Sequence, residues 1–227
     1  MVKEIGLSDI LSYGIYQYQM RTGKIRSRTP LEGYPPINFP PDRKPCLDLF
    51  ASNWKVASAQ RTWSLFQLST HLAKTGSFRP FGGIPIPLSL NPPLHQLNHW
   101  TEYTNSINNI DIKLVWEPAR FSWAVDLAHA YSATQKENLA EFYWTKVEEF
   151  ISSNPVNCGP NWASAQEVAL RLIAWIISLG AVKDSTATTP ERVNLITRSI
   201  WQHAKRILPT LGYARSQNNN HILSEAL

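Results

Sequence analysis

The sequence predicts an all-α fold, in which antiparallel helical hairpins fill the second half and a proline-rich, largely irregular arm precedes them. Apolar residues recur at three- and four-residue spacing from about residue 119 to residue 208, the pattern of helices that bury one face. Most of the 16 prolines lie instead at residues 30–45 and 80–93, where their density argues against regular helices, whereas residues 46–75 between them are ambiguous. We therefore expect an N-terminal helix and arm at residues 1–93, packed on a partial helical domain at residues 94–227.

The first part begins with a short helix, expected at residues 8–20, with Ser8 as its cap and Gly23 beyond its end. The turn that follows carries four cations, Arg21, Lys24, Arg26 and Arg28. A solvated turn and a binding patch are both consistent with them. Residues 29–45 are expected to lie as an extended arm on the surface of the domain, and residues 77–97 to form coil.

Helices in the second part are expected between clear breaks in the apolar pattern. Residues 111–118 are predicted to be a short extended segment, after which Pro118 begins a helix that reaches Tyr131. Another helix starts near Gln135 and ends at Asn154, which precedes a proline.

The helix after Trp162 is apolar on most of its faces as far as Leu179, so it is predicted to lie in the interior. Thr189 is the expected cap of the next helix, and Pro209 the residue that stops it. The chain then crosses Gly212 to an asparagine cluster, from which a last helix is expected to begin.

The composition favours an acidic partner. The formal charge is +5 and the isoelectric point about 9.2, which suits nucleic acid or an acidic polysaccharide. The absence of a run of five lysines or arginines argues against nucleic acid. The two cysteines, Cys46 and Cys158, predict neither a disulfide framework nor a metal set, and we expect no cofactor.

The sequence also bears on location. Residues 1–7 lack the apolar core of a secretory signal, and the most apolar stretch, residues 170–182, contains Arg171 and is short for a bilayer. We expect no membrane span and a cytoplasmic location, with a periplasmic one as the alternative. The oligomeric state is not indicated.

Three loop-to-helix junctions suggest a site. They lie at Trp116–Pro118, Asn161–Trp162 and Asn220–His221, and each interval spans one helical hairpin with its loops. In antiparallel hairpins every second helix starts at the same end, so these junctions are expected to meet on one face. The candidate residues there are Trp116, Glu117, Arg120, Asn161, Trp162, Glu167, Arg171, Asn220 and His221.

Each candidate also has a purely structural interpretation. Arg171 and Glu167 are four residues apart on one helix and can pair with each other. Arg120 can bind a carboxylate of a ligand or pair with Glu117. The asparagine cluster can serve only as a helix cap.

Three motifs in this order resemble the heparinase II/III-like family of polysaccharide lyases, which also contains alginate lyases. They are the segment Asp111–Phe121, the pair Asn154–Pro155 followed by Gly159–Trp162, and Asn219–His221 with Glu225. The resemblance covers roughly residues 94–227. It implies an incomplete α/α toroid, normally followed by a β-sandwich, and β-elimination on a uronic-acid-containing polysaccharide of the heparin, heparan or alginate kind.

The resemblance also implies roles for single residues. Asn220 would neutralise the uronate carboxylate, and His221 would assist it or act as the base. Trp116 and Trp162 would offer stacking faces, with Arg120, Asn161, Glu167 and Arg171 as further substrate contacts. The family's catalytic Tyr and a further His lie downstream of the Asn–His motif. The sequence ends before them, so we expect an N-terminal portion that is inactive by itself.

Two other function classes compete with a lyase. One is a non-catalytic helical module that binds an anionic glycan or a partner in polysaccharide biosynthesis. The other is a glycoside hydrolase, which needs two carboxylates flanking the scissile bond. Glu117, Glu167 and Glu225 are the carboxylates available near the expected face.

Overall fold

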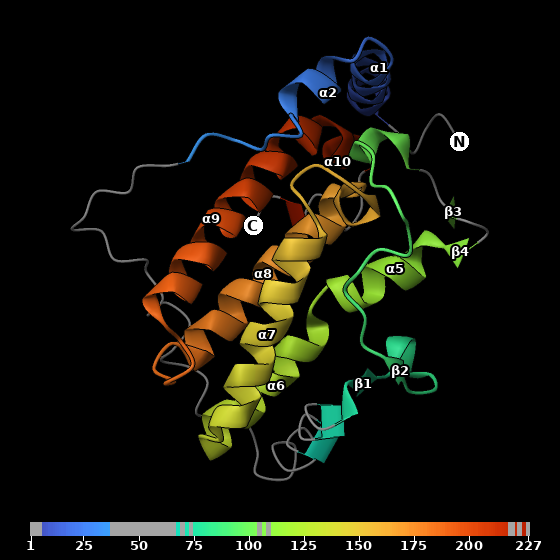
Figure 1. Ribbon diagram of the computed structural model, residues 1–227. Coiled ribbons are helices and arrows are strands. Elements are labelled where there is room, and N and C mark those ends of the chain that lie inside the picture. The colour runs from blue at the N-terminus through green and yellow to red at the C-terminus, as the bar shows by residue number, and fades with distance from the viewer. Residues whose placement is uncertain are drawn as a thin grey trace.

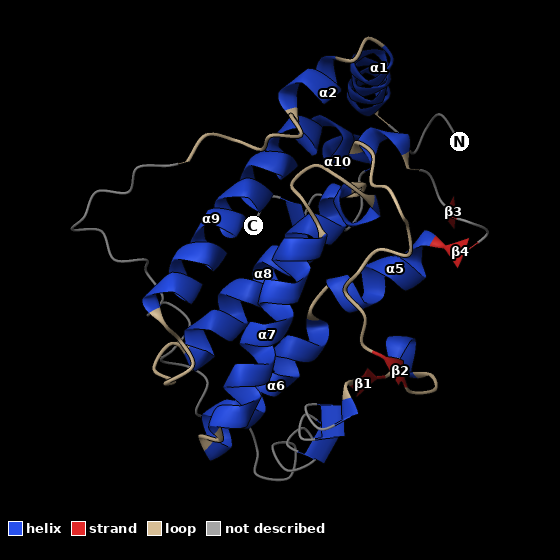
Figure 2. Ribbon diagram, viewed as in Figure 1, coloured by secondary structure: helices blue, strands red, loops and turns tan. Residues whose placement is uncertain are grey.

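Helices dominate the regular structure of the computed structural model (Figures 1 and 2), which confirms the all-α prediction. The structure describes residues 6–36, 67–68, 71–72, 75–103, 106–107, 110–217, 221 and 224–225. Within these ranges the strands are short: β1 (Ser77–Phe78) pairs with β2 (Ile86–Pro87), and β3 (Ser106–Ile107) with β4 (Ile110–Asp111), both antiparallel. The predicted division at residues 93 and 94 stays a prediction.

The core lies between helices α6 (Ser122–Thr134), α7 (Glu137–Ser153), α8 (Ala165–Val182) and α9 (Pro190–Ile207). They run side by side in Figure 1, where α6–α7 and α8–α9 form antiparallel hairpins and α8 packs against α6. The predicted cap of α9 is confirmed, because the Thr189 side chain accepts a hydrogen bond from the Arg192 amide.

Helix α8 is the interior helix that the sequence predicted. It is 18 residues long and, by length and composition, apolar enough to cross a membrane. This corrects the expectation that the apolar stretch, residues 170–182, is too short for a bilayer. The fold buries 61% of it, as expected of a core helix in a globular protein. Its N-cap is Ser164, which accepts from the Glu167 amide, and Asn161 is not the cap.

Two predicted non-helical segments are helices. Residues Ile112–Ala119 form α5, because the Asp111 carboxylate caps it by accepting from the Lys113 amide at 2.9 Å. Pro118 lies inside α5 one residue before its end, so it removes the backbone bond to the Leu114 carbonyl, and it does not start α6. Likewise, the expected crossing near Gly212 is the helix α10 (Leu211–Gln217).

Phe121 forms the turn between α5 and α6. Its φ of 58° lies in the left-handed region, which non-glycine residues rarely adopt. The ring is fully buried and packs against the rings of Trp123, Phe150 and Trp175 at centroid distances of 5.0, 5.6 and 5.4 Å. These contacts hold the backbone in that conformation.

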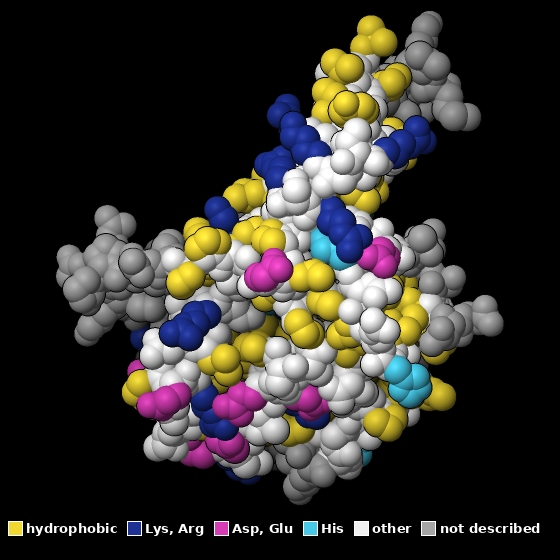
Figure 3. Space-filling view, turned by 45° about the horizontal axis from the view of Figure 1, so that its top comes forward, with side chains coloured by type: hydrophobic (Ala, Val, Ile, Leu, Met, Phe, Trp, Pro, Cys, Tyr) yellow, Lys and Arg dark blue, Asp and Glu magenta, His cyan; other side chains and the backbone are white. Residues whose placement is uncertain are grey.

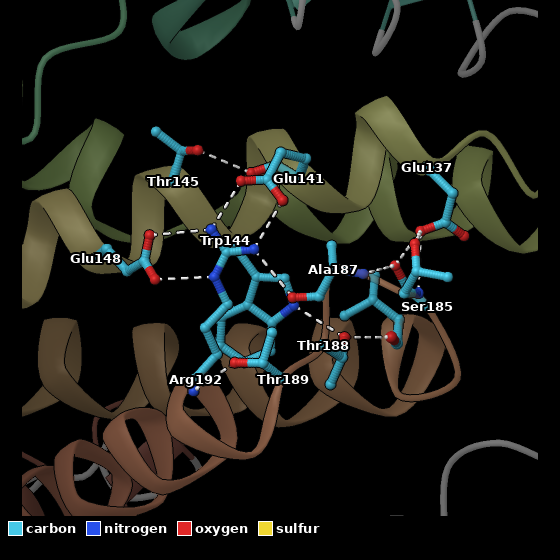
Figure 4. A network of polar contacts seen from close by, with 12 residues as sticks. Glu137, Glu141, Trp144, Thr145, Glu148, Ser185, Ala187, Thr188, Thr189 and Arg192 are labelled. Carbon is cyan, nitrogen blue, oxygen red and sulfur yellow. Dashed lines mark hydrogen bonds and ion pairs between the residues drawn. The ribbon is translucent and has the colours of Figure 1, made fainter.

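A polar network ties α7 to the connection between α8 and α9 (Figure 4). The Arg192 guanidinium donates to both oxygens of Glu141 and both oxygens of Glu148 on α7. Glu137, at the start of α7, accepts from the hydroxyls of Ser185 and Thr186 at 2.6 and 2.7 Å. The hairpins are therefore fastened at both ends of this interface.

The N-terminal part packs on the other end of the domain. Helix α1 (Leu7–Arg21) lies against α10, and α2 (Lys24–Arg28) follows after Gly23. Figure 3 shows α1 projecting from the body, with apolar side chains on its surface and cations around its base. The described start of the arm lies along α9, where Tyr34 and Gln202 exchange two hydrogen bonds. Residues 37–45 of the predicted arm lie outside the described ranges.

Candidate functional site

A cavity of about 380 Å³ lies where α1, α5, the start of α8, the end of α9, and α10 meet. Four of the site residues predicted from the sequence line it: Trp116, Arg120, Glu167 and His221. They come from α5, α8 and the segment after α10, so segments far apart in the sequence converge here. The other polar or aromatic lining residues are Tyr16, Trp100, Lys113, Ser164, Gln166, Arg206, Thr210, Tyr213 and Glu225.

Arg120 is clamped between two carboxylates. Its Nε and Nη2 donate to the two oxygens of Glu167 at 2.5 and 2.8 Å, and its Nη1 donates to Glu117 at 2.7 Å. Hydrogen bonding of the Arg120 guanidinium to the Glu167 carboxylate is the main reason that the pKa of Arg120 is raised above its ordinary value. Of the two structural alternatives, the Arg120–Glu117 pair is confirmed. The Arg171–Glu167 pair is wrong, because Glu167 pairs with Arg120.

Trp116 is held in place by its indole N–H, which donates to the Pro160 carbonyl at 2.8 Å. The indole is half-buried and borders the cavity. Its polar edge is therefore satisfied by the protein, and its apolar surface contributes to the cavity wall.

His221 and Glu225 form a pair at the cavity. The Nδ1 atom of His221 lies 3.2 Å from Oε1 of Glu225, one turn later. Burial raises the pKa of the Glu225 carboxyl above its ordinary value, while His221 and Arg206 act in the opposite direction. With Glu225 ionised, the Nδ1–H donates, which places the imidazole lone pair on Nε2. Asn220, the other predicted catalytic residue, lies outside the described residues.

Asn161, Trp162 and Arg171 lie behind the cavity wall, not on it, and each is 1% exposed. The Trp162 indole donates to the Asn154 carbonyl, so the exposed stacking face expected of it is not present. Arg171 points across the interior, where it donates to His203 Nε2 at 2.9 Å and to the carbonyls of Ala119 and Asn161. Burial lowers its pKa to about 9. These residues do lie at the end of the fold that the sequence predicted. Asn161 and Trp162 are in a buried 3₁₀ turn (Pro160–Trp162), and Arg171 is on the buried side of α8, so all three point inward.

Several cavity residues were not found from the sequence, Arg206, Tyr213 and Tyr16 among them. Arg206 interrupts the apolar stripe of α9 on its buried side, a signal that helical periodicity could have revealed. Tyr213 lies on α10, a helix that the sequence did not predict. Tyr16 enters the cavity from α1, about 200 residues earlier, and no local pattern announces such a contact.

No group of three His, Cys, Asp or Glu side chains is arranged to hold a metal ion within the described ranges. The chemistry available at the cavity is therefore that of an imidazole–carboxylate pair, hydroxyls, aromatic faces and cations.

Comparison with known proteins gave one match. Residues 95–227 match the family described as heparinase II/III N-terminus, which is more than half of the chain. No curated protein and no solved structure gives a significant match. The matched region contains every residue predicted for the site, whereas Tyr16 lies outside it.

Proposed function

This chain belongs to the heparinase II/III N-terminus family, and on that premise we propose that it is the helical part of a polysaccharide lyase-like protein. The proposed substrate is a uronic-acid-containing polysaccharide of the heparin, heparan or alginate kind, and the proposed reaction is β-elimination. The supporting observation is the convergence of Trp116, Arg120 and His221 on one cavity from separate parts of the chain. We also propose that the hairpins form part of an incomplete α/α toroid.

The reaction defines what the site must supply. A base removes the proton at C5 of the uronate, the electron pair forms a C4–C5 double bond, and the C4–O bond breaks. The leaving oxygen takes a proton from an acid. The C5 proton becomes acidic enough only if the neighbouring carboxylate is neutralised, so that the developing enolate is stabilised.

His221 is the proposed base or carboxylate partner. A neutral imidazole accepts a proton at the ring nitrogen that carries no hydrogen, here Nε2. Glu225 fixes the tautomer by accepting from Nδ1 and holds the ring against rotation. By resemblance, the Asn220 amide neutralises the substrate carboxylate.

The remaining wall residues suit an acidic sugar chain. Lys113, an exposed residue at the cavity, provides a cation, and Trp116 provides an apolar surface for a sugar ring. Asn161, Trp162 and Arg171 are proposed to support this wall from behind, through the Arg171 bonds to the carbonyls of Ala119 and Asn161.

The test is an elimination assay. The protein, at the length that its gene encodes, is incubated with heparin, heparan sulfate and alginate, and the ultraviolet absorbance of the unsaturated uronate is followed together with new reducing ends. We expect both signals to rise together on one of these polymers. The variants His221→Gln and Asn220→Ala should lose at least tenfold in rate, as expected for loss of an acid–base or charge-stabilising group. His95→Gln, an exposed residue that does not line the cavity, is the matched control.

The competing functions give different results. Reducing ends without the chromophore would identify a glycoside hydrolase and refute elimination. Binding of the polymer without either signal would identify a non-catalytic glycan-binding module. That second candidate is favoured by the fact that Lys113 and Trp116 can bind a glycan without any proton transfer.

A further inference from the structure

Arg206 is a cation buried at the cavity. Its side chain is fully buried, and its guanidinium carbon lies 3.6 Å from the centroid of the Trp100 ring. The guanidinium donates to the Trp162 carbonyl, to the Ala163 carbonyl and to the Thr210 hydroxyl. All of these partners are neutral.

The positive charge of Arg206 has no ion-pair partner within the described part of the chain. A buried charge without a partner of opposite sign is costly, and burial lowers the pKa of Arg206 to about 10. Arg171, the other fully buried arginine, likewise has neutral partners but lies behind the wall. Arg206 differs because it borders the cavity. An anionic group in that cavity would offset the cost.

Tyr16 brings a hydroxyl to the same place. Its ring packs on Tyr213 at a centroid distance of 4.7 Å, and both rings line the cavity beside Arg206. Burial raises the pKa of Tyr16, and the charge of Arg206 is the leading influence in the opposite direction. No hydrogen bond of the Tyr16 hydroxyl is found among the described residues, so none of them takes up this donor.

Glu225 adds an acceptor with no partner. Its Oε1 is bound to His221, while its Oε2 is buried and makes no hydrogen bond in the described structure. A buried acceptor that is left unpaired points to a ligand that donates. A sugar carries hydroxyl donors of this kind next to its acidic group.

We propose that Arg206, Tyr16 and Glu225 form a subsite that binds one acidic sugar unit, with the acid group on the guanidinium and the Tyr16 hydroxyl and a sugar hydroxyl on Glu225. The N-terminal helix α1 thereby becomes part of the binding site, although it lies outside the family match. The proposal rests on the proposed function for the choice of a uronate as ligand.

The experiment measures binding by the 227-residue chain. Tetrasaccharides from alginate and from heparin are titrated by calorimetry, alongside a carboxyl-reduced alginate tetrasaccharide of the same length. The variants are Tyr16→Phe and Arg206→Gln. Tyr13→Phe is the matched control, since Tyr13 is also on α1 and its ring also lies near Tyr213, at 6.4 Å, but it does not line the cavity.

We expect at least one acidic tetrasaccharide to bind, and the carboxyl-reduced alginate tetrasaccharide to bind more weakly than the acidic ones that bind. Tyr16→Phe should weaken acidic binding about tenfold, and Arg206→Gln about a hundredfold. Tyr13→Phe should bind as the wild type does. If Arg206→Gln does not fold, Tyr16→Phe carries the test alone.

The two proposals fail differently. Binding that is unchanged in Tyr16→Phe would overturn the subsite and leave the lyase proposal intact. Binding that weakens as expected, in a protein that produces no unsaturated uronate, would overturn the lyase proposal and leave the subsite intact. No binding of either acidic tetrasaccharide by the wild type would overturn the subsite.

Discussion

The clamp on Arg120 allows a sharp test of how the cavity is built. Glu167 is almost fully buried and accepts two hydrogen bonds from Arg120, whose side chain is 29% exposed. In Glu167→Gln the charge is lost and one acceptor becomes an amide donor that faces a guanidinium N–H. A hydrogen bond between charged groups contributes about 1.5–3 kcal/mol. Because Arg120 keeps Glu117 and some solvent, we expect a loss of about 2 kcal/mol in the free energy of unfolding.

The assay is urea unfolding followed by tryptophan fluorescence, combined with a double-mutant cycle. The cycle joins Glu167→Gln with Arg120→Met and isolates the energy of the pair from other effects of each change. We expect a coupling energy of about 1–2 kcal/mol. The matched control is Glu149→Gln, which removes a carboxylate that pairs with Lys146 nearer the surface and should cost less than about 1 kcal/mol. A loss below about 0.5 kcal/mol in Glu167→Gln, or the same loss in the Arg120→Met background, would refute the clamp.

Two further predictions concern protons. Burial and the Arg171 charge hold the pKa of His203 well below its ordinary value, so the folded state keeps it neutral while the unfolded chain takes up a proton below about pH 6.5. Stability should therefore fall by about 1 kcal/mol as the pH drops from 6.5 to 5.5, and urea midpoints of His203→Gln should lose part of this slope; an unchanged slope would contradict a neutral buried His203. Hydrogen bonds from Ser185 and Thr186 lower the pKa of Glu137 to about 2, so their contribution to stability is present above about pH 4.5 and is lost as the pH falls toward 2. Carboxyl NMR titration should show this low midpoint and a higher one in Ser185→Ala, and a midpoint near 4.5 in the wild type would count against the network in Figure 4.

The helical hairpins could be predicted because their signals are local. Apolar spacing located α6 to α9, and Thr189 with Pro190 marked the start of α9 correctly. The error at α5 also has a local cause, since Pro118 was interpreted as the start of a helix. The helix instead begins at the Asp111 cap, and Pro118 falls inside it one residue before its end.

The cavity could be predicted only in part. The hairpin argument brought Trp116, Arg120, Glu167 and His221 to one end of the fold, and these residues do line the cavity. It could not tell which side chains at that end point outward. That choice depends on the rotation of α8 about its axis, which is set by packing across the whole core. The contribution of Tyr16 depends on the docking of α1 on α10, a contact between distant parts of the sequence.

Phe121 links the geometry of the cavity to the packing of the core. Its left-handed backbone costs roughly 1–3 kcal/mol and persists because three aromatic rings enclose its side chain. Arg120 is the adjacent residue, so the direction of its side chain depends on the packing of an aromatic cluster that does not line the cavity. A substitution at Phe150 or Trp175 would therefore move the Arg120 guanidinium without altering any lining residue. Two chains with identical cavity residues would then differ in the shape of the cavity because of substitutions on α7 and α8.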